Sequence, residues 1–256
     1  MMIGVGVRDK MVLTKDFSEQ YLICKNKHDE TSKNGSRIIV NNRNEIQLFL
    51  SILKDNVKVY EPDFIEDKEI IDWLFDKTIE DILEDFRMTR KTILEVKDIL
   101  PRIGIPNQIC EELSLSKYDS RVKKELVHKV NEQNVMLSDF YRLPNTDMLF
   151  SKVIIDTEEI NLDHVSDDHV QSMVLAEVCR QSTVLAASIV QDPKLRFIVT
   201  QDIKNYKNFV VNNQPSYIQM LCMTPKKKGA GFSMFNIVQD GKSCVHGYLV
   251  GYSYLR

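Results

Sequence analysis

The stretch that decides the fold is DHVSDDHVQSMVLAEVCRQSTVLAA, residues 163–187. It begins with two histidines among aspartates and then becomes an almost unbroken apolar run. A segment of this length, apolar on nearly every side, predicts a helix that other parts of the fold must cover. Asp167 or Asp168 is suited to cap its first turn. The charged residues inside the run, Glu177 and Arg180, therefore need a structural or a chemical reason.

Segments with high β propensity flank this helix on both sides. Two come before it, Val135–Leu143 and Leu149–Asp156, and a turn at PNTD joins them. Those that follow it are Leu195–Asp202, Asn208–Val211, Tyr217–Thr224, Phe232–Gln239 and Cys244–Tyr254, with a hairpin turn at Asp240-Gly241. This order predicts an α+β fold in which one curved antiparallel sheet wraps around a long central helix, as in a hotdog domain, over residues 126–256.

The first 120 residues have a different pattern and predict a mainly helical N-terminal domain with a short β-hairpin. Tyr21–Cys24 and Arg37–Val40 are its strands, with a turn at Asn34-Gly35. Apolar residues then recur at intervals of three and four up to about residue 100, which predicts helices. Pro101 and Pro106 are expected to break the last helix, and residues 114–125 are expected to form a linker. No motif identifies the role of this part, which could be a winged-helix-like or a carrier-recognition module.

Length, composition and net charge limit the class of protein. The chain has 256 residues, of which 43% are hydrophobic, enough for a buried core. A net charge of −3 argues against a nucleic-acid-binding protein, because such proteins usually have a basic face. No uninterrupted apolar run is long enough to predict a membrane span, and the five cysteines form no CxxC pair. We therefore expect a cytoplasmic protein with no nucleic-acid or membrane partner.

Three polar residues mark one side of the predicted helix. Glu177 and Gln181 lie one turn apart on an otherwise apolar face, and Arg180 lies within ion-pair reach of Glu177. Burial would raise the pKa of Glu177 and suit it to act as a general acid or base in a pocket. The alternative is structural, with these residues fixing the helix at a subunit contact. The pattern leaves both interpretations open.

Two histidines precede the helix in a polar loop. A histidine beside a carboxylate is a common acid–base couple, so His164 or His169 is a candidate partner for Glu177. The alternative is a capping or surface role for each histidine. The spacing of the aspartates and histidines fits no standard metal-binding motif, so we expect no metal site.

Two blocks of the sequence resemble the A-factor biosynthesis (AfsA-type) hotdog family. The first, VHKVNEQNVMLSDFYRL at residues 127–143, contains that family's VHK, then an [VL]L[TS]D strand and RL. The second, DHVSDDHVQSMVLAEVCRQ at residues 163–181, resembles DHxxDHVPGMxLLEAxRQ. It has Gln171-Ser172 in place of Pro-Gly and one extra residue between the histidines. The resemblance covers roughly residues 126–256.

The resemblance implies acyl-thioester chemistry. Such proteins are similar in fold to hydroxyacyl-ACP dehydratases and acyl-CoA thioesterases. They are associated with joining a β-ketoacyl group, held on acyl carrier protein, to a hydroxyl of dihydroxyacetone phosphate, on the way to γ-butyrolactone signals. The catalytic residues that it implies are Glu177, His164 and His169, and the substrate-binding residues are Arg180, Gln181, Lys129 and His128.

The resemblance also implies substrate and partners. The substrate is an acyl thioester of phosphopantetheine, on acyl carrier protein or coenzyme A, with no bound cofactor, and Lys129 could pair with a phosphate. Typical members carry two hotdog repeats, whereas this chain shows one, so a homodimer is expected. Two alternatives remain: a non-catalytic acyl-binding or regulatory module, and a dehydratase- or thioesterase-like hotdog enzyme.

Overall fold

The computed structural model describes residues 21–24, 36–39, 49, 52–53, 56–59, 98–155, 168–190, 195–223 and 229–255. His164 and the helices predicted between residues 60 and 97 lie outside this part of the chain. The division into domains at residues 1–120 and 126–256 stays a prediction.

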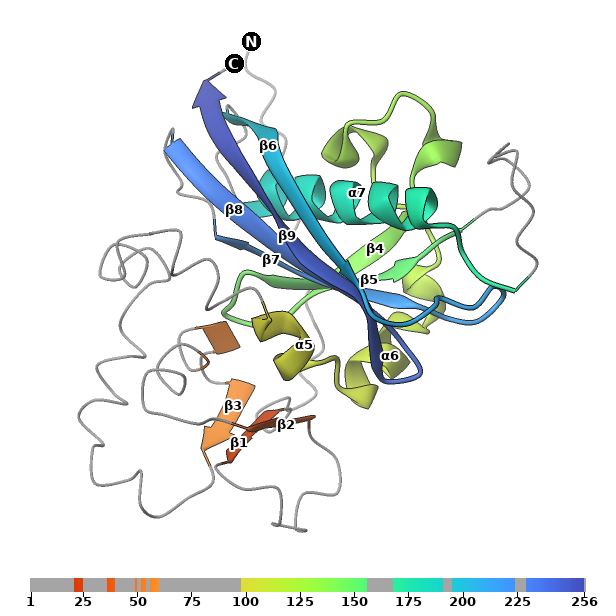
Figure 1. Ribbon diagram of the computed structural model, residues 1–256, viewed down its shortest axis with the longest axis vertical. Coiled ribbons are helices and arrows are strands. Elements are labelled where there is room, and N and C mark those ends of the chain that lie inside the picture. The colour runs from red at the N-terminus through yellow and green to blue at the C-terminus, as the bar shows by residue number, and fades with distance from the viewer. Residues whose placement is uncertain are drawn as a thin grey trace.

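One six-stranded antiparallel sheet forms the centre of the molecule (Figure 1). Its strands run in the spatial order β4-β5-β7-β8-β9-β6, so the third strand along the chain returns to the far edge. The bounds are β4 Leu137–Arg142, β5 Met148–Val153, β6 Leu195–Tyr206, β7 Tyr217–Met223, β8 Gly229–Gln239 and β9 Lys242–Leu255. The turn between β8 and β9 has positive φ at Asp240 and Gly241, which is the geometry that favours glycine in a two-residue hairpin.

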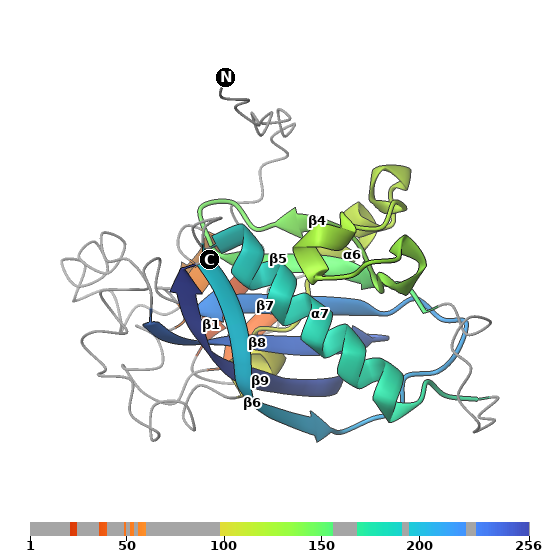
Figure 2. The ribbon, with the colours of Figure 1, turned by 90° about the horizontal axis from the view of Figure 1, so that it is seen from above.

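The helix α7, Ser172–Val190, lies along one face of this sheet, and Figure 2 shows the strands passing beneath it. Its apolar side chains, such as Val178 and Leu185, pack against Phe235 and Ile237 of β8. By length and composition α7 could also cross a membrane, but 61% of its most apolar window is buried in the fold, as in a core helix. The predicted hotdog architecture of the C-terminal region, a curved sheet around one apolar helix, is confirmed.

The opposite face of the sheet, here called the outer face, is also covered. The helices α5, Ile99–Ile103, and α6, Asn107–Leu113, lie on it (Figure 1). They share one apolar core with outward-facing strand residues, including Phe150, Met234 and Tyr248. The prediction for Pro101 is wrong, because it lies inside α5, in the first turn, where no backbone N–H is needed. Pro106 does separate the two helices, as predicted.

The segment before β4 is folded, so the prediction of a linker at residues 114–125 is wrong. It contains the short 3-10 helices η3 Ser116–Tyr118, η4 Lys124–Val127 and η5 Glu132–Asn134. The buried side chains of Val122, Val127 and Val135 join the core around α7. Ser188 Oγ of α7 donates to the Leu126 carbonyl at 3.1 Å. The segment is polar overall, so its composition predicted a linker. The three buried valines nevertheless pack it against α7.

The described N-terminal strands are β1 Tyr21–Cys24, β2 Ser36–Ile39 and β3 Val57–Val59. They form a separate sheet in the order β2-β1-β3, and both pairings are parallel. The predicted strand positions are therefore close to those observed, but the predicted hairpin is wrong. Parallel neighbours need a crossover connection, whereas a tight turn joins only antiparallel strands.

Candidate functional site

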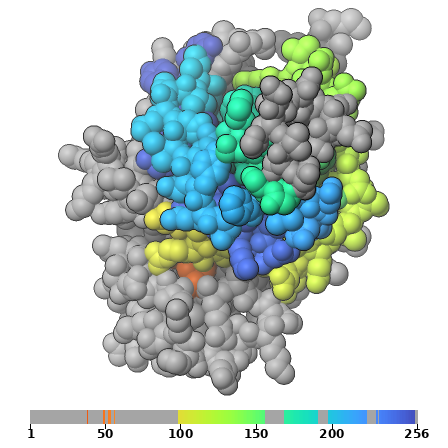
Figure 3. Space-filling view, turned by 45° about the vertical axis from the view of Figure 1, so that its right-hand side comes forward, coloured from red at the N-terminus to blue at the C-terminus, as the bar shows by residue number. Residues whose placement is uncertain are grey.

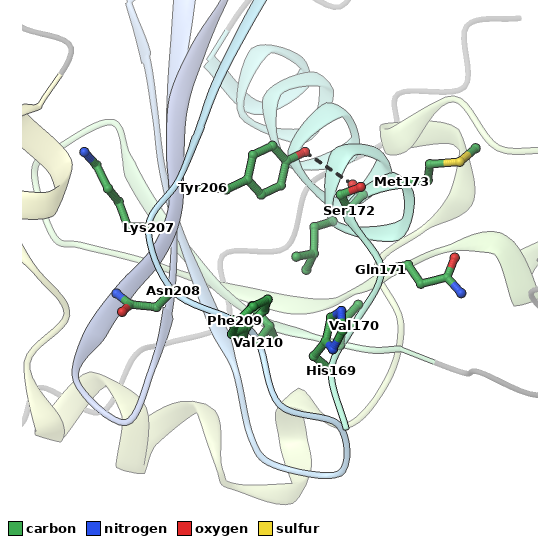
Figure 4. A pocket seen from close by; sticks show the side chains of 11 residues that line it. His169, Val170, Gln171, Ser172, Met173, Tyr206, Lys207, Asn208, Phe209 and Val210 are labelled. Atoms are coloured by element: carbon green, nitrogen blue, oxygen red, sulfur yellow. Dashed lines mark hydrogen bonds between the residues drawn. The ribbon is translucent and has the colours of Figure 1, made fainter. Parts of the chain in front are cut away.

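A cavity of about 710 Å³ lies where the chain enters α7 (Figure 4). Three segments meet there: the residues before α7, the end of β6, and the loop that follows β6. In the space-filling view, β6 (cyan-blue) lies beside α7 (teal) on this side of the molecule (Figure 3). The lining residues are His169, Val170, Gln171, Ser172, Met173, Leu175, Tyr206, Lys207, Asn208, Phe209 and Val210.

Backbone hydrogen bonds hold two of these segments together. Val170 N donates to the Val210 carbonyl at 2.7 Å, and His169 pairs with Val211 in an isolated antiparallel bridge. The buried side chain of Gln239 fixes the loop from below, because it accepts from Val211 N at 2.7 Å and donates to Val211 O at 3.1 Å. The segment predicted as a strand at Asn208–Val211 is therefore a loop with one bridge, and it forms a wall of the cavity.

His169 lies in that wall, about one third exposed. Its Nδ1 is 2.7 Å from the carboxylate of Asp168. Its ring lies beside the ring of Phe209, with centroids 4.9 Å apart and planes at 49°. These two contacts fix the orientation of the imidazole at the cavity (Figure 4). Across the opening, the Tyr206 hydroxyl donates to the Ser172 carbonyl at 3.3 Å.

Glu177 lies elsewhere, in a polar cluster on α7. Arg180 donates to both carboxylate oxygens, with both distances 2.8 Å. Lys129 Nζ is 2.6 Å from Oε1, and Gln181 Nε2 donates to the same oxygen at 3.0 Å. Arg180 and Gln181 are the i+3 and i+4 neighbours of Glu177 on the helix. Lys129, in contrast, is 48 residues away in sequence.

The electrostatics of Glu177 differ from the prediction. Burial raises the pKa of a carboxyl group, but hydrogen bonds from Arg180, Lys129 and Gln181 outweigh that effect here and hold the pKa of Glu177 at about 2. The expected raised pKa is therefore wrong. At neutral pH Glu177 is an ionised acceptor, and the same contact raises the pKa of Arg180.

Gln181 extends the cluster to the segment before β4. Its side chain is fully buried, accepts from Met136 N at 2.8 Å and donates to the Asn134 carbonyl at 2.8 Å. His128 is exposed and adopts a left-handed φ of 55° at the end of η4, next to Lys129. The structure thus brings Lys129, Glu177, Arg180 and Gln181 together.

His169 lies apart from this cluster, beside the cavity, and the cavity lining does not include Glu177. Sequence patterns missed two cavity residues in particular, Tyr206 and Phe209. The available signal was a pair of large aromatic residues close together around the start of the segment predicted as the strand Asn208–Val211. Within the described part of the chain, no group of three or more His, Cys, Asp or Glu side chains could hold a metal ion.

Comparison with protein families gives one match. The model of the A-factor biosynthesis hotdog domain matches residues 114–247. This range begins just before the folded segment that precedes β4 and ends within β9. It includes both the Glu177 cluster and the cavity. A search of curated proteins found no match.

Solved structures with a similar arrangement are distant. One is a hypothetical thioesterase with coenzyme A from Streptococcus pneumoniae TIGR4, at 12% identity, covering 43% of this chain and 80% of that chain, with a TM-score of 0.36. A conserved protein from Pseudomonas aeruginosa has 12% identity, coverages of 51% and 98%, and a TM-score of 0.42. A thioesterase from Haemophilus influenzae has 9% identity, coverages of 54% and 95%, and a TM-score of 0.42. At these scores the likenesses carry no argument about activity.

Proposed function

The chain belongs to the A-factor biosynthesis hotdog domain family, and from this premise we propose that it binds an acyl group carried as a thioester and transfers it. The donor is a β-ketoacyl thioester of phosphopantetheine, on acyl carrier protein or coenzyme A. The acceptor is a hydroxyl of dihydroxyacetone phosphate, as in the formation of γ-butyrolactone signals. The cavity at the start of α7 is the acyl site.

The observation that carries this proposal is the cavity itself. Its volume of about 710 Å³ lies within the range of roughly 300–1,000 Å³ that is usual for small-molecule sites. Val170, Leu175 and Val210 give it an apolar interior suited to an acyl chain. His169 and the first turn of α7 supply polar groups at its edge. An apolar interior with few polar groups is the composition expected of a site for a lipid-like substrate.

His169 is the group best placed to move a proton in this cavity. It would accept the proton of the attacking hydroxyl while the hydroxyl oxygen bonds to the thioester carbonyl carbon, and return it to the sulfur when the C–S bond breaks. Asp168 at Nδ1 makes Nε2 the nitrogen that exchanges this proton. Amide groups in the first turn of a helix carry partial positive charge and suit the developing oxyanion.

Glu177 has a different part in this proposal. An ionised carboxylate with a pKa of about 2 cannot donate a proton at neutral pH, and two cations already contact it. We assign it to holding the segment before β4 against α7, together with Gln181. Its catalytic role stays a prediction that variants must test. The protein would act in the cytoplasm and as a homodimer, which are likewise proposals.

The test is an assay of acyl transfer with defined substrates. Acetoacetyl-CoA and a longer β-ketoacyl-CoA would be incubated with dihydroxyacetone phosphate, and mass spectrometry would measure the ester product and the released thiol. His169→Gln should lower the rate by about 100-fold or more, as expected for loss of acid–base catalysis. Glu132→Gln is the control, because Glu132 is exposed and outside the cavity lining. Equal rates for His169→Gln and the unmodified chain would exclude the proposed role.

A second candidate function is acyl binding without turnover. It is favoured by the two ion pairs of Glu177, because an ionised carboxylate held by Lys129 and Arg180 is poorly suited to proton transfer. Under this alternative, calorimetry would detect binding of the β-ketoacyl thioester, while neither the unmodified chain nor His169→Gln would form product.

A further inference from the structure

The edge strand β6 differs from the other strands on the face that it turns toward α7. On β8 and β9 that face carries apolar residues such as Ile237 and Leu249. On β6, the alternate positions Asp202, Lys204 and Tyr206 face the same way, because Asp202 and Tyr206 pair with Leu249 and Val245 of β9, which belong to the core around α7. Asp202 and Lys204 both act on the pKa of the buried Cys179 thiol of α7, and Tyr206 contacts Ser172. The three side chains therefore form a polar row between β6 and α7.

Lys204 is the unusual member of this row. Its side chain is only 13% exposed, although it lies on an edge strand. Its ammonium pairs with the carboxylate of Asp202. An ammonium has three donor hydrogens, and among the described residues no acceptor other than Asp202 contacts it. A largely buried cation with donors to spare favours a further acceptor.

The row leads directly to the cavity. Tyr206 is one of the lining residues, and Lys204 lies two residues before it, roughly 7 Å along the strand on the same face. Figure 4 shows the Tyr206 ring reaching from β6 toward Ser172 at that side of the cavity. A ligand whose acyl part fills the cavity could therefore place an anionic end beside Lys204.

A structural explanation of the row also exists. Inward-pointing charges on an edge strand discourage pairing with other sheets. A single charge is sufficient for that purpose, whereas here a cation, its counter-ion and a phenol follow one another toward a cavity. The unused donors of Lys204 favour a ligand over edge protection, and the two explanations predict different behaviour of a neutral variant.

We infer that Lys204 binds the phosphate of the substrate, with Asp202 holding the ammonium in position. This inference rests on the proposed acyl-transfer function and gives the phosphate contact to Lys204, since Lys129 is engaged by Glu177. A phosphate carries up to two negative charges and three acceptor oxygens, which suit a point cation with donors to spare. The phosphate belongs either to the pantetheine arm or to the phosphorylated acceptor.

Calorimetry with paired probes tests the inference and separates these sources. The first pair is acetoacetyl-CoA and acetoacetyl-pantetheine, and the second is dihydroxyacetone phosphate and dihydroxyacetone. The unmodified chain should prefer the phosphorylated member of one pair, and that pair identifies the source. Lys204→Met should weaken binding of that member by about tenfold or more and leave its phosphate-free partner within about twofold. Lys204→Arg should retain most of the preference, because it keeps the charge.

Lys152→Met is the matched control. Lys152 is also a largely buried lysine paired with an aspartate, at 2.5 Å from Asp119, but it is not among the residues that line the cavity. If Lys204→Met is poorly folded, Lys204→Gln and the salt dependence of the unmodified chain replace it. If Lys204→Met binds all four probes as the unmodified chain does but self-associates more, the row protects the strand edge. That result would overturn the phosphate inference and leave the proposed function standing. Failure of the unmodified chain to bind either thioester would overturn the proposed function as well.

Discussion

Glu177 shows that a sequence can predict the neighbours of a residue on its own helix and still give the wrong direction for the shift of its pKa. The helical spacing predicts its contact with Arg180, because residues three apart share a face. It does not predict Lys129, whose approach depends on how the segment before β4 folds over α7. The contact with Lys129 matters for the pKa of Glu177. Burial alone would raise this pKa, but Arg180, Lys129 and Gln181 together lower it.

The pH dependence of stability should report this residue. The pKa of Glu177 in the folded chain, about 2, lies below its ordinary value of 4.5, so the ionised carboxylate stabilises the fold above pH 4.5 and this contribution is lost as pH falls toward 2. In denaturant titrations Glu177→Gln should cost on the order of 2 kcal/mol at pH 7 and progressively less toward pH 3.

The control for that experiment is Glu125→Gln. Glu125 is exposed in η4, close to the cluster but outside it. Its substitution should change the free energy of unfolding by less than about 0.5 kcal/mol at every pH. A cost for Glu177→Gln that stays constant from pH 7 to pH 3 would contradict the lowered pKa.

The cavity residues could be predicted only in part. His169 was identified because it stands in a polar loop before an apolar helix. Tyr206 and Phe209 were not. Tyr206 lies beyond the predicted end of its strand at Asp202, and Phe209 lies in a segment predicted as a strand, although the sheet ends at Tyr206. The bridge between His169 and Val211 that forms the cavity wall joins segments about 40 residues apart.

At the scale of the element, the strands and the central helix follow from local patterns. β4, β5, β7, β8 and β9 lie within a few residues of their predicted bounds, because each alternates between a face toward α7 and a face toward α5 and α6. β6 runs to Tyr206 instead of ending near residue 202. Its polar inward positions break the apolar alternation on which the prediction depended.

The pairing of β6 with β9 depends on a residue without a side chain. A Cβ at Gly247 would lie 1.9 Å from the Ile203 carbonyl oxygen, which is backbone and cannot move aside cheaply. Gly247→Ala should therefore lower the free energy of unfolding by about 3 kcal/mol or more. Chemical denaturation measures this directly, and amide hydrogen exchange should show faster exchange along β6.

Thr200→Ala serves as the comparison on the same strand. Its side chain is exposed and makes one hydrogen bond to the Val250 carbonyl at 3.2 Å. Its loss should cost about 1 kcal/mol or less. If both variants are equally stable, the close approach at Gly247 is not a constraint on the fold.

At the scale of the whole molecule, the two faces of the sheet have different coverings. α7 covers one, and α5, α6 and the N-terminal residues Ile38, Phe49, Ile52 and Leu53 belong to the core on the other. Sequence patterns predicted the first and not the second, because nothing local shows which face a short helix will cover. The parallel order β2-β1-β3 was missed for the same reason, since it depends on crossover connections.

A shared core predicts coupled unfolding. Leu53 is fully buried in the cluster that also contains Phe232 and Met234 of β8. Leu53→Ala should cost about 2–5 kcal/mol and lower the midpoint of a single calorimetric transition that includes the sheet. Two separate transitions, with only the smaller one shifted, would show that the N-terminal part unfolds independently.

The covered outer face also limits how copies of this chain can assemble. Because α5 and α6 cover this face, it cannot stack on the sheet of another copy, so this sheet can be extended between copies only along its strand edges. At β4, Val122 N donates to Leu137 O and Asp139 N to Ser120 O, so the preceding segment already occupies that edge. β6 is then the one edge of the sheet along which no described residue pairs. Two copies that pair along β6 leave no open edge on this sheet among the described residues, so this contact by itself gives a closed pair of copies and not a continuing row.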